Sequence, residues 1–240
     1  MDADRALRKK SLQTGPRRHN HSRGCSISKE TTMRSIVAGL ALALLAAPGL
    51  AADQDPSAQS KGFFNGKNLD GWEGLNQYWS VKEGAIVGAS GERIPFNTFL
   101  CSKKAYGDFE LSFQVRLKDG KGNSGLQIRS KVVNKERYVV HGPQCDIGAG
   151  YWGSLYGEGV GGMWKAAPKE AQSKIKPNDF NDYSIKVVGK RVTIKVNGVT
   201  TVDQDFPKMA DEGIIAWQLH SGPPMEVTFR NIVFKDLSKK

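Results

Sequence analysis

Polar side chains spaced by two residues recur in three segments of the chain and offer groups suited to acid–base chemistry. The pairs are Gln127/Arg129, Gln144/Asp146 and Gln218/His220. Residues two apart in a β-strand point to the same face, so each pair is expected to share a face. An ordinary solvated face is dominated by Lys, Glu and Thr. Gln, Arg, Asp and His instead form directional, often bidentate hydrogen bonds.

The segment GPQCDIGAGYWGSLYGE, residues 142–158, places carboxylates and aromatic rings beside one of these pairs. Its five glycines allow tight bends. Asp146 and Glu158 supply carboxylates, and Trp152 and Tyr156 supply rings that could stack on the apolar face of a sugar. Two interpretations of the rings stay open: they line a pocket over the polar face, or they close the end of the fold.

The elements that carry these groups are predicted to be β-strands. FELSFQVRL (109–117) and YSIKVVGKRVTIKVNGVTTV (183–202) alternate apolar and polar residues with a period of two. Turn signals lie at Glu83–Gly84, Gly189–Lys190 and Asn197–Gly198. A strand face bearing His220 ends at the turn SGPP, a usual place for binding residues.

The strand pattern predicts an all-β fold, an antiparallel jelly-roll sandwich. Apolar positions change parity between Phe229 and Ile232, which indicates a β-bulge. The one helix-like stretch, around 169–174, is brief. Many short strands without a sustained helical period are typical of sandwiches and jelly rolls.

Residues 1–52 are expected to be an N-terminal extension that ends in a cleavable signal peptide. The apolar run 36–50 is short for a membrane span and is followed by small residues near Ala52. Met1 and Met33 both stay open as the translation start. The mature protein is therefore expected to be periplasmic or secreted, without a membrane anchor.

The net charge of +11 comes largely from that extension. Residues 1–52 hold nine of the 35 Lys and Arg residues and three of the 24 Asp and Glu residues, so the remainder has a net charge of +5. This modest value does not predict nucleic-acid binding. Residues 53–61 are expected to be a linker, and 62–237 a single domain large enough for its own core.

Two cysteines, Cys101 and Cys145, fall in strand-like segments of the exported part. One disulfide and two buried thiols fit their positions equally well. The sequence contains no C-x-x-C motif.

Five segments together resemble the 3-keto-disaccharide hydrolase domain family, over residues 62–237. They are FFNGKNLDGW (63–72), NSGLQIRS (123–130), GPQCDIGAGYWGSLYGE (142–158), NDYSIKVVGKRVTIKVNGV (181–199) and GIIAWQLHSGPPMEVTFRNIVFKDL (213–237). The resemblance implies a concanavalin A-like jelly roll, export, and cleavage of glycosides whose sugar has been oxidised to a 3-ketone.

That activity implies an eliminative route. A C3 ketone acidifies the C2 proton, so a base removes it, the C1 oxygen leaves, and water adds to the enone. The route needs a base, a group that stabilises the enediolate, and an acid for the leaving oxygen. Strand parity and this chemistry assign the base to Asp146 or Glu158, the acid to His220, and the enediolate contacts to Arg129 and Gln144. The expected substrate contacts are Gln127, Gln218, Tyr156 and Trp152.

A divalent cation is a further hypothesis, with Asp146, Glu158 and His220 as its candidate ligands. The alternative to an enzyme is a non-catalytic, lectin-like carbohydrate-binding module of the same fold. A structural or adhesive wall protein fits the sequence less well, because that role would not explain the polar pairs. An enzyme needs a carboxylate of perturbed pKa in its pocket, whereas a lectin does not, so these three residues favour the enzyme.

Overall fold

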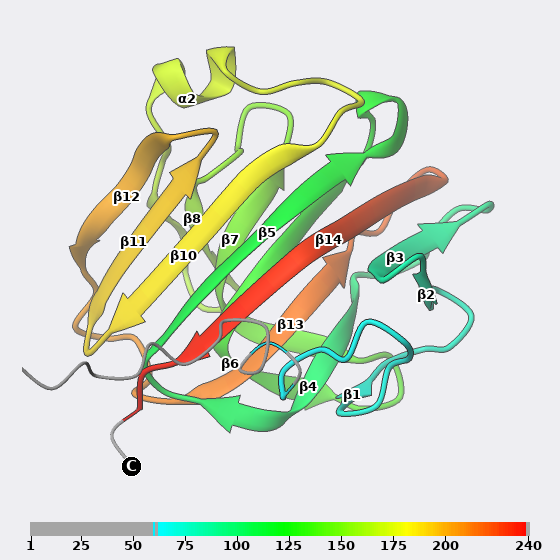
Figure 1. The fold of residues 1–240 in the computed structure, drawn as a ribbon, viewed down its shortest axis with the longest axis horizontal. Coiled ribbons are helices and arrows are strands. Elements are labelled where there is room, and N and C mark those ends of the chain that lie inside the picture. The colour runs from blue at the N-terminus through cyan, green and yellow to red at the C-terminus, as the bar shows by residue number, and fades with distance from the viewer. Residues whose placement is uncertain (1–59, 61, 239–240) are drawn as a thin grey trace, which may run out of the picture. The chain divides into compact units, whose positions relative to one another are not determined.

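Two antiparallel sheets of seven strands face one another in residues 60 and 62–238, the part of the chain that the computed structural model describes (Figure 1). Sheet A contains, in spatial order, β1 (Trp72–Glu73), β4 (Thr98–Tyr106), β13 (Gly213–Leu219), β6 (Asn123–Asn134), β7 (Val139–Gly148), β8 (Leu155–Glu158) and β9 (Gly162–Lys165). Sheet B contains β12 (Val199–Asp205), β11 (Arg191–Val196), β10 (Asn181–Val188), β5 (Phe109–Leu117), β14 (Met225–Asp236), β3 (Ala85–Ser90) and β2 (Trp79–Lys82). The connections include the 3-10 helix η1 (Lys118–Gly120) and the helix α2 (Lys169–Ser173). The predicted all-β antiparallel sandwich is confirmed.

The period-two alternation produces strands with one buried face. In β5 every apolar residue is buried and every polar residue between them is partly exposed. The predicted hairpin turns join β2 to β3 and β11 to β12. Glu83 (φ 50°) and Gly84 (φ 76°) make the first turn, and Asn197 (φ 47°) and Gly198 (φ 82°) make the second.

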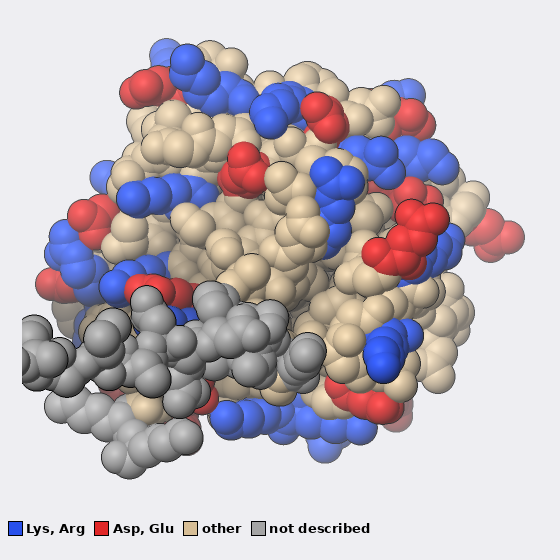
Figure 2. Space-filling model, viewed as in Figure 1, with Lys and Arg blue, Asp and Glu red and all other residues tan. Residues whose placement is uncertain are grey.

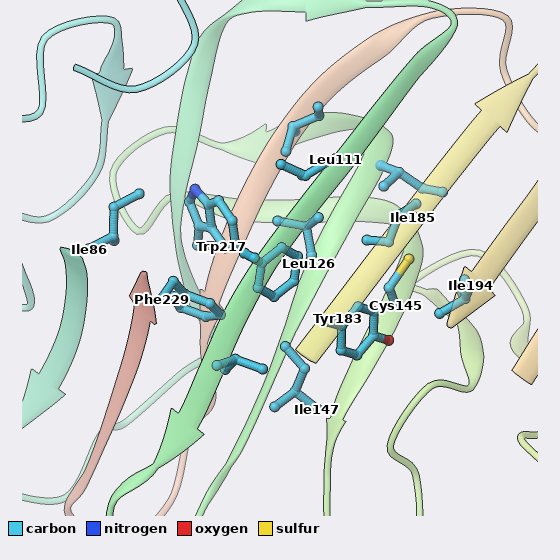
Figure 3. Close-up of a cluster of buried hydrophobic side chains, with 14 of the residues drawn as sticks. Ile86, Leu111, Leu126, Cys145, Ile147, Tyr183, Ile185, Ile194, Trp217 and Phe229 are labelled. Carbon is cyan, nitrogen blue, oxygen red and sulfur yellow. The ribbon is translucent and has the colours of Figure 1, made fainter. Parts of the chain in front are cut away.

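The core lies between the inner faces of the two sheets (Figure 3). Trp217 of sheet A packs on Phe113 and Phe229 of sheet B, with ring centroids 5.1 Å and 4.5 Å away. Burying each such side chain contributes roughly 1.5–3 kcal/mol, so this layer is the main source of stability.

Bulges in β14 and β6 change the face on which the following side chains lie. The predicted bulge in β14 is confirmed, because pairing with β5 shifts between Arg230 and Val233 and Asn231 has φ 52°. The bulge in β6 was not predicted. Its pairing with β7 shifts after Gln127, and Arg129 adopts φ 44°. An extra residue reverses the alternation of faces. The expectation that Gln127 and Arg129 share a face is therefore wrong.

Sheet A curls so that its outer face, the one turned away from sheet B, is partly enclosed. Val140 of β7 clusters with Phe99 and Cys101 of β4, although β13 and β6 lie between these strands. Thr98 Oγ1 also donates to Arg137 O in the β6–β7 hairpin at 2.8 Å. Side chains of β13 and β6 beneath this hairpin are consequently buried on both faces of the sheet.

Cys101 and Cys145 are free, buried thiols on opposite faces of sheet A. They therefore form no disulfide, which settles the alternative left open above. Burial raises the pKa of the Cys101 thiol to about 12 and that of Cys145 well above its usual value.

The face formed by sheet B carries Lys and Arg interspersed with Asp and Glu (Figure 2). The predicted signal segment, 1–52, lies outside the described residues, as does most of the linker. Among the residues that the structure describes, no helix is both long and apolar enough to cross a membrane.

Candidate functional site

A chain of side-chain hydrogen bonds crosses the outer face of sheet A, over β6, β7 and β13. Ser130 Oγ donates to Gln127 Oε1 at 2.7 Å, and Gln127 Nε2 donates to Gln144 Oε1 at 3.1 Å. Gln144 Nε2 then donates to Asp146 Oδ1 at 3.0 Å and to Gln218 Oε1 at 3.3 Å. We call these five residues the amide chain. It joins the predicted residues Gln127, Gln144, Asp146 and Gln218.

The side chains of the amide chain are buried and do not form a solvated surface. Gln127 and Gln218 are fully buried, and only 8% of Asp146 is exposed. Buried polar atoms are normally paired, yet Gln218 Nε2 has no hydrogen-bond partner among the described residues. Gly125 makes room for the chain, since a Cβ there would lie 2.6 Å from Gln144 Cδ.

Asp146 has the electrostatics of a general base. The pKa of its carboxyl is raised to about 7, mainly by burial; the hydrogen bond from Gln144 lowers this pKa, and the nearby Glu158 adds to the rise. A pKa near neutrality is suited to proton transfer at physiological pH.

Half-buried Asn97 links the two segments that carry the other predicted catalytic residues, Glu158 and His220. Asn97 Nδ2 donates to Glu158 Oε1 at 3.2 Å, and Asn97 Oδ1 accepts from Ser221 N at 2.9 Å. His220 Nδ1 lies 2.6 Å from Ser221 O. A carbonyl oxygen only accepts, so Nδ1 carries the hydrogen, and Nε2 is the acceptor in the neutral ring. Tyr156 pairs with Gln144 across β7 and β8, on the same face as Glu158.

Asn97 is a site residue that the sequence reasoning missed. It precedes β4 in an irregular segment and belongs to no alternating pair. Its link to Glu158 spans 61 positions of the chain, which no local pattern signals.

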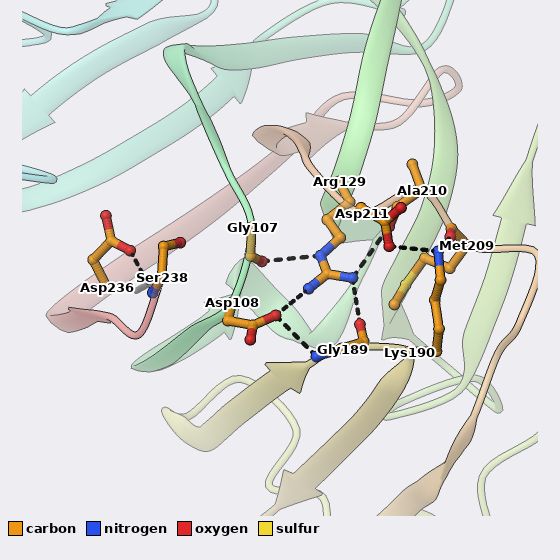
Figure 4. A network of polar contacts seen from close by, with 10 residues as sticks. All are labelled: Gly107, Asp108, Arg129, Gly189, Lys190, Met209, Ala210, Asp211, Asp236 and Ser238. Atoms are coloured by element: carbon orange, nitrogen blue, oxygen red, sulfur yellow. Dashed lines mark hydrogen bonds and ion pairs between the residues drawn. The ribbon is translucent and has the colours of Figure 1, made fainter. Parts of the chain in front are cut away.

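Arg129 lies away from this site, contrary to expectation (Figure 4). Its guanidinium donates to Gly107 O at 2.9 Å, to Ala210 O at 3.1 Å and to Gly189 O, and it pairs with Asp108 Oδ1 at 2.7 Å. The side chain is 1% exposed. Because the bulge turns Arg129 away from the amide chain, its side chain ties β6 to three neighbouring loops, where four of its five N–H groups are engaged.

Trp152 is also not on the outer face. It is 5% exposed and belongs to the core between the sheets, with Gln172 Nε2 donating to its carbonyl at 2.8 Å. For Trp152 the structure therefore supports the interpretation that it closes the end of the fold, whereas Tyr156 lies on the outer face.

The three candidate cation ligands, Asp146, Glu158 and His220, are not gathered into a metal-binding group. Within residues 60 and 62–238, no cluster of three or more His, Cys, Asp or Glu side chains is arranged to hold a metal ion.

Removing the charge of Glu158 should lower the pKa of Asp146. Glu158→Gln deletes one of the two causes that raise this pKa, so the value should fall toward its ordinary range by less than burial contributes. A ¹³C NMR titration of the Asp146 carboxyl measures the change. Glu158→Asp keeps the charge and is the control. Equal pKa values in the two variants would contradict the assigned coupling.

A sequence profile of the 3-keto-alpha-glucoside-1,2-lyase-like domain family matches residues 59–235. This range spans nearly all of the two sheets described above. No match was found among the curated protein sequences.

Many solved structures match this chain, and the following three are among them. Two are candidate glycosyl hydrolases from Parabacteroides distasonis ATCC 8503. One is 20% identical, covering 71% of this chain and 96% of its own, with a TM-score of 0.55. The other is 18% identical, covering 73% and 93%, with a TM-score of 0.50. The third is the carbohydrate-binding module CBM66 from Bacillus subtilis, 18% identical over 69% and 95%, with a TM-score of 0.53. Such likeness establishes the shared jelly-roll fold.

Proposed function

The chain belongs to the 3-keto-alpha-glucoside-1,2-lyase-like domain family, and from this premise we propose that it cleaves glycosides whose sugar carries a ketone at C3. One observation carries the proposal beyond the family. Asp146 is a buried carboxyl with a pKa of about 7 at the end of the amide chain. A buried carboxyl near half-ionisation is what a base acting on an acidified C–H bond requires.

The proposed reaction begins when Asp146 takes the C2 proton and the C2–H electron pair forms the enediolate with the C3 carbonyl. The enediolate then expels the C1 oxygen, which takes a proton from the protonated Glu158 carboxyl or from Nε2–H of the His220 imidazolium, and water adds to the enone. A developing oxyanion is stabilised by preorganised donors. Arg129 is engaged away from the site, which leaves Gln144 as the expected contact of the enediolate.

A lectin-like module is the second candidate, because most of the amide chain is neutral. Gln127, Gln144 and Gln218 are groups that could bind sugar hydroxyls without chemistry. Such a module has no need for a carboxyl that titrates near pH 7, and Asp146 is the residue that distinguishes the two functions.

Export is part of the proposal. The apolar run 36–50 followed by small residues supports a signal peptide and a periplasmic or secreted location for the domain.

The test uses purified protein with a 3-keto-disaccharide and, separately, its unoxidised parent, each with and without a chelator. We expect release of free sugar from the keto substrate alone. Loss of that release with chelator would show that a cation takes part. If neither sugar is cleaved but either one raises the melting temperature, the enzyme proposal fails and the binding module replaces it.

A further inference from the structure

We propose that the outer face of sheet B, the face turned away from sheet A, binds a glycan that carries an oxyanion, either a carboxylate or a sulfate ester. The site combines two arginine side chains held by one aromatic ring with a neighbouring hollow lined by polar groups. It lies on the opposite side of the sandwich from the amide chain (Figure 1), so this inference goes beyond the cleavage reaction proposed above.

Phe180 holds the two guanidinium groups close to one another. It directly precedes β10, and its ring centroid lies 3.4 Å from Cζ of Arg230 on β14 and 4.9 Å from Cζ of Arg116 on β5. The sum of these distances, 8.3 Å, is the largest separation that the two Cζ atoms can have. Stacking on an aromatic ring restricts a guanidinium but does not use its in-plane N–H groups, which stay able to donate.

The charges of these two arginines are not neutralised by ion pairs. Among the described residues neither guanidinium pairs with a carboxylate, and the one hydrogen bond that they donate runs from Arg230 Nε to Gln114 Oε1 at 3.0 Å. Nε of Arg116 is buried and has no partner there. Arg191 of the same sheet differs, since its Nε lies 3.0 Å from Asp203 Oδ1. Two unpaired cations this close repel one another, so an oxyanion that accepts from both would be held by charge-assisted hydrogen bonds.

Two acidic side chains of this face are engaged by other groups. Asp182 Oδ1 accepts from Gln114 Nε2 at 2.9 Å, and Glu226 pairs with Lys118 Nζ at 3.7 Å. Gln114 therefore contacts both Arg230 and Asp182 and links the two arginines to the middle of the sheet. The two guanidinium groups are consequently available to an anion from outside the protein.

A hollow of about 340 Å³ lies beside the two arginines, in the middle of sheet B. Ser112 on β5 and Ser184 on β10 are direct cross-strand partners, and their short side chains leave space between the longer ones. The other polar residues that line the hollow are Gln114, Asp182, Lys195 and Asn231. Hydroxyl, amide, carboxylate and ammonium groups together offer the donors and acceptors that sugar hydroxyls need. A sugar in the hollow can thus direct its acidic group to the arginines, because Gln114 lines the hollow and contacts Arg230.

The test is isothermal titration calorimetry of the purified protein with digalacturonate, sulfated galactobiose and neutral galactobiose. We expect an anionic disaccharide to bind more tightly than the neutral one, and the better ligand identifies the carboxylate or the sulfate as the group recognised. Arg230→Gln should weaken this binding by about tenfold, the size of a lost hydrogen bond to a charged group. Arg191→Gln removes the same charge from the same sheet and should bind as wild type does.

Phe180→Leu keeps both charges but removes the ring that holds them, so it should also weaken binding, which a general attraction to basic charge would not produce. Cleavage of a soluble 3-keto-disaccharide should stay unchanged in these variants, and their melting temperatures check that they are folded. Equal affinity for neutral and anionic disaccharides, no binding of either anionic one, or equal losses in Arg230→Gln and Arg191→Gln would overturn the inference. Anion-dependent binding in a protein that cleaves no keto sugar would refute the proposed function and support this second site.

Discussion

Asp146→Asn should abolish turnover while making the protein more stable at alkaline pH. The amide keeps an oxygen to accept from Gln144 but cannot take the C2 proton. Loss of a general base typically lowers the rate by about 10²–10⁴-fold. We expect kcat/KM for a 3-keto-disaccharide to fall by about 10³-fold.

The stability gain follows from the raised pKa of Asp146. The pKa of Asp146 is about 7 in the folded protein, against an ordinary value of 3.8. Its contribution to the free energy of unfolding is therefore fully present below pH 4, where the carboxyl is protonated in both states, and is lost as the pH rises to 7. About three pKa units correspond to at most ~4 kcal/mol. Asn does not ionise, so the Asp146→Asn protein does not lose this stability. The difference in the free energy of unfolding between the variant and wild type should therefore grow from pH 4 to pH 8.

Urea unfolding of wild type and variant at several pH values between 4 and 8 measures this difference. Asp182→Asn is the matched control, because Asp182 is an exposed carboxylate that accepts from Gln114 on sheet B. An advantage of Asp146→Asn that does not change with pH would contradict the raised pKa. Retained turnover in a folded Asp146→Asn protein would remove this residue from the mechanism.

Arg129→Met should destabilise the fold severely without touching the amide chain directly. The substitution keeps an apolar side chain in a site that is 1% exposed, but three carbonyl oxygens lose their donor and Asp108 keeps only the hydrogen bond from Gly189 N. Removing one partner of a buried charged group costs roughly 3–5 kcal/mol, and the partial exposure of Asp108 places the expected loss near the lower end of that range.

Chemical denaturation at pH 7 measures the loss. Arg191→Met is the control, because that guanidinium is about half exposed and pairs with Asp203 on the surface. Exposed ion pairs contribute little, so the control should unfold nearly as wild type does. Equal midpoints for the two arginine variants would contradict the structural role of Arg129.

The alternation of apolar and polar residues predicted most of the strands and the outer polar face. Gln127, Gln144 and Gln218 were placed on one face by parity alone, and the structure brings them into a single network. Parity works there because the side-chain period of a strand is two and the pairing is regular around these positions.

The same rule failed two residues further along β6. One extra residue at the bulge reversed the face of Arg129, and the apolar residues that precede it in β6, Leu126 and Ile128, show no change of parity of the kind that revealed the bulge in β14. Trp152 was ambiguous for a different reason. A tryptophan in a glycine-rich loop fits both a pocket and a core, and only the distant side chains that pack on it decide between them.

The two thiols lie on opposite faces of sheet A, so their reactivity can report two different openings of the fold. Thiols react as thiolates, so burial and raised pKa values protect Cys101 and Cys145 while the native contacts persist. Cys101 becomes reachable when the β6–β7 hairpin lifts from β4, whereas Cys145 requires the sheets to separate. Alkylation rates at the two positions would thus time the uncovering of the site and the global unfolding of the sandwich within one polypeptide.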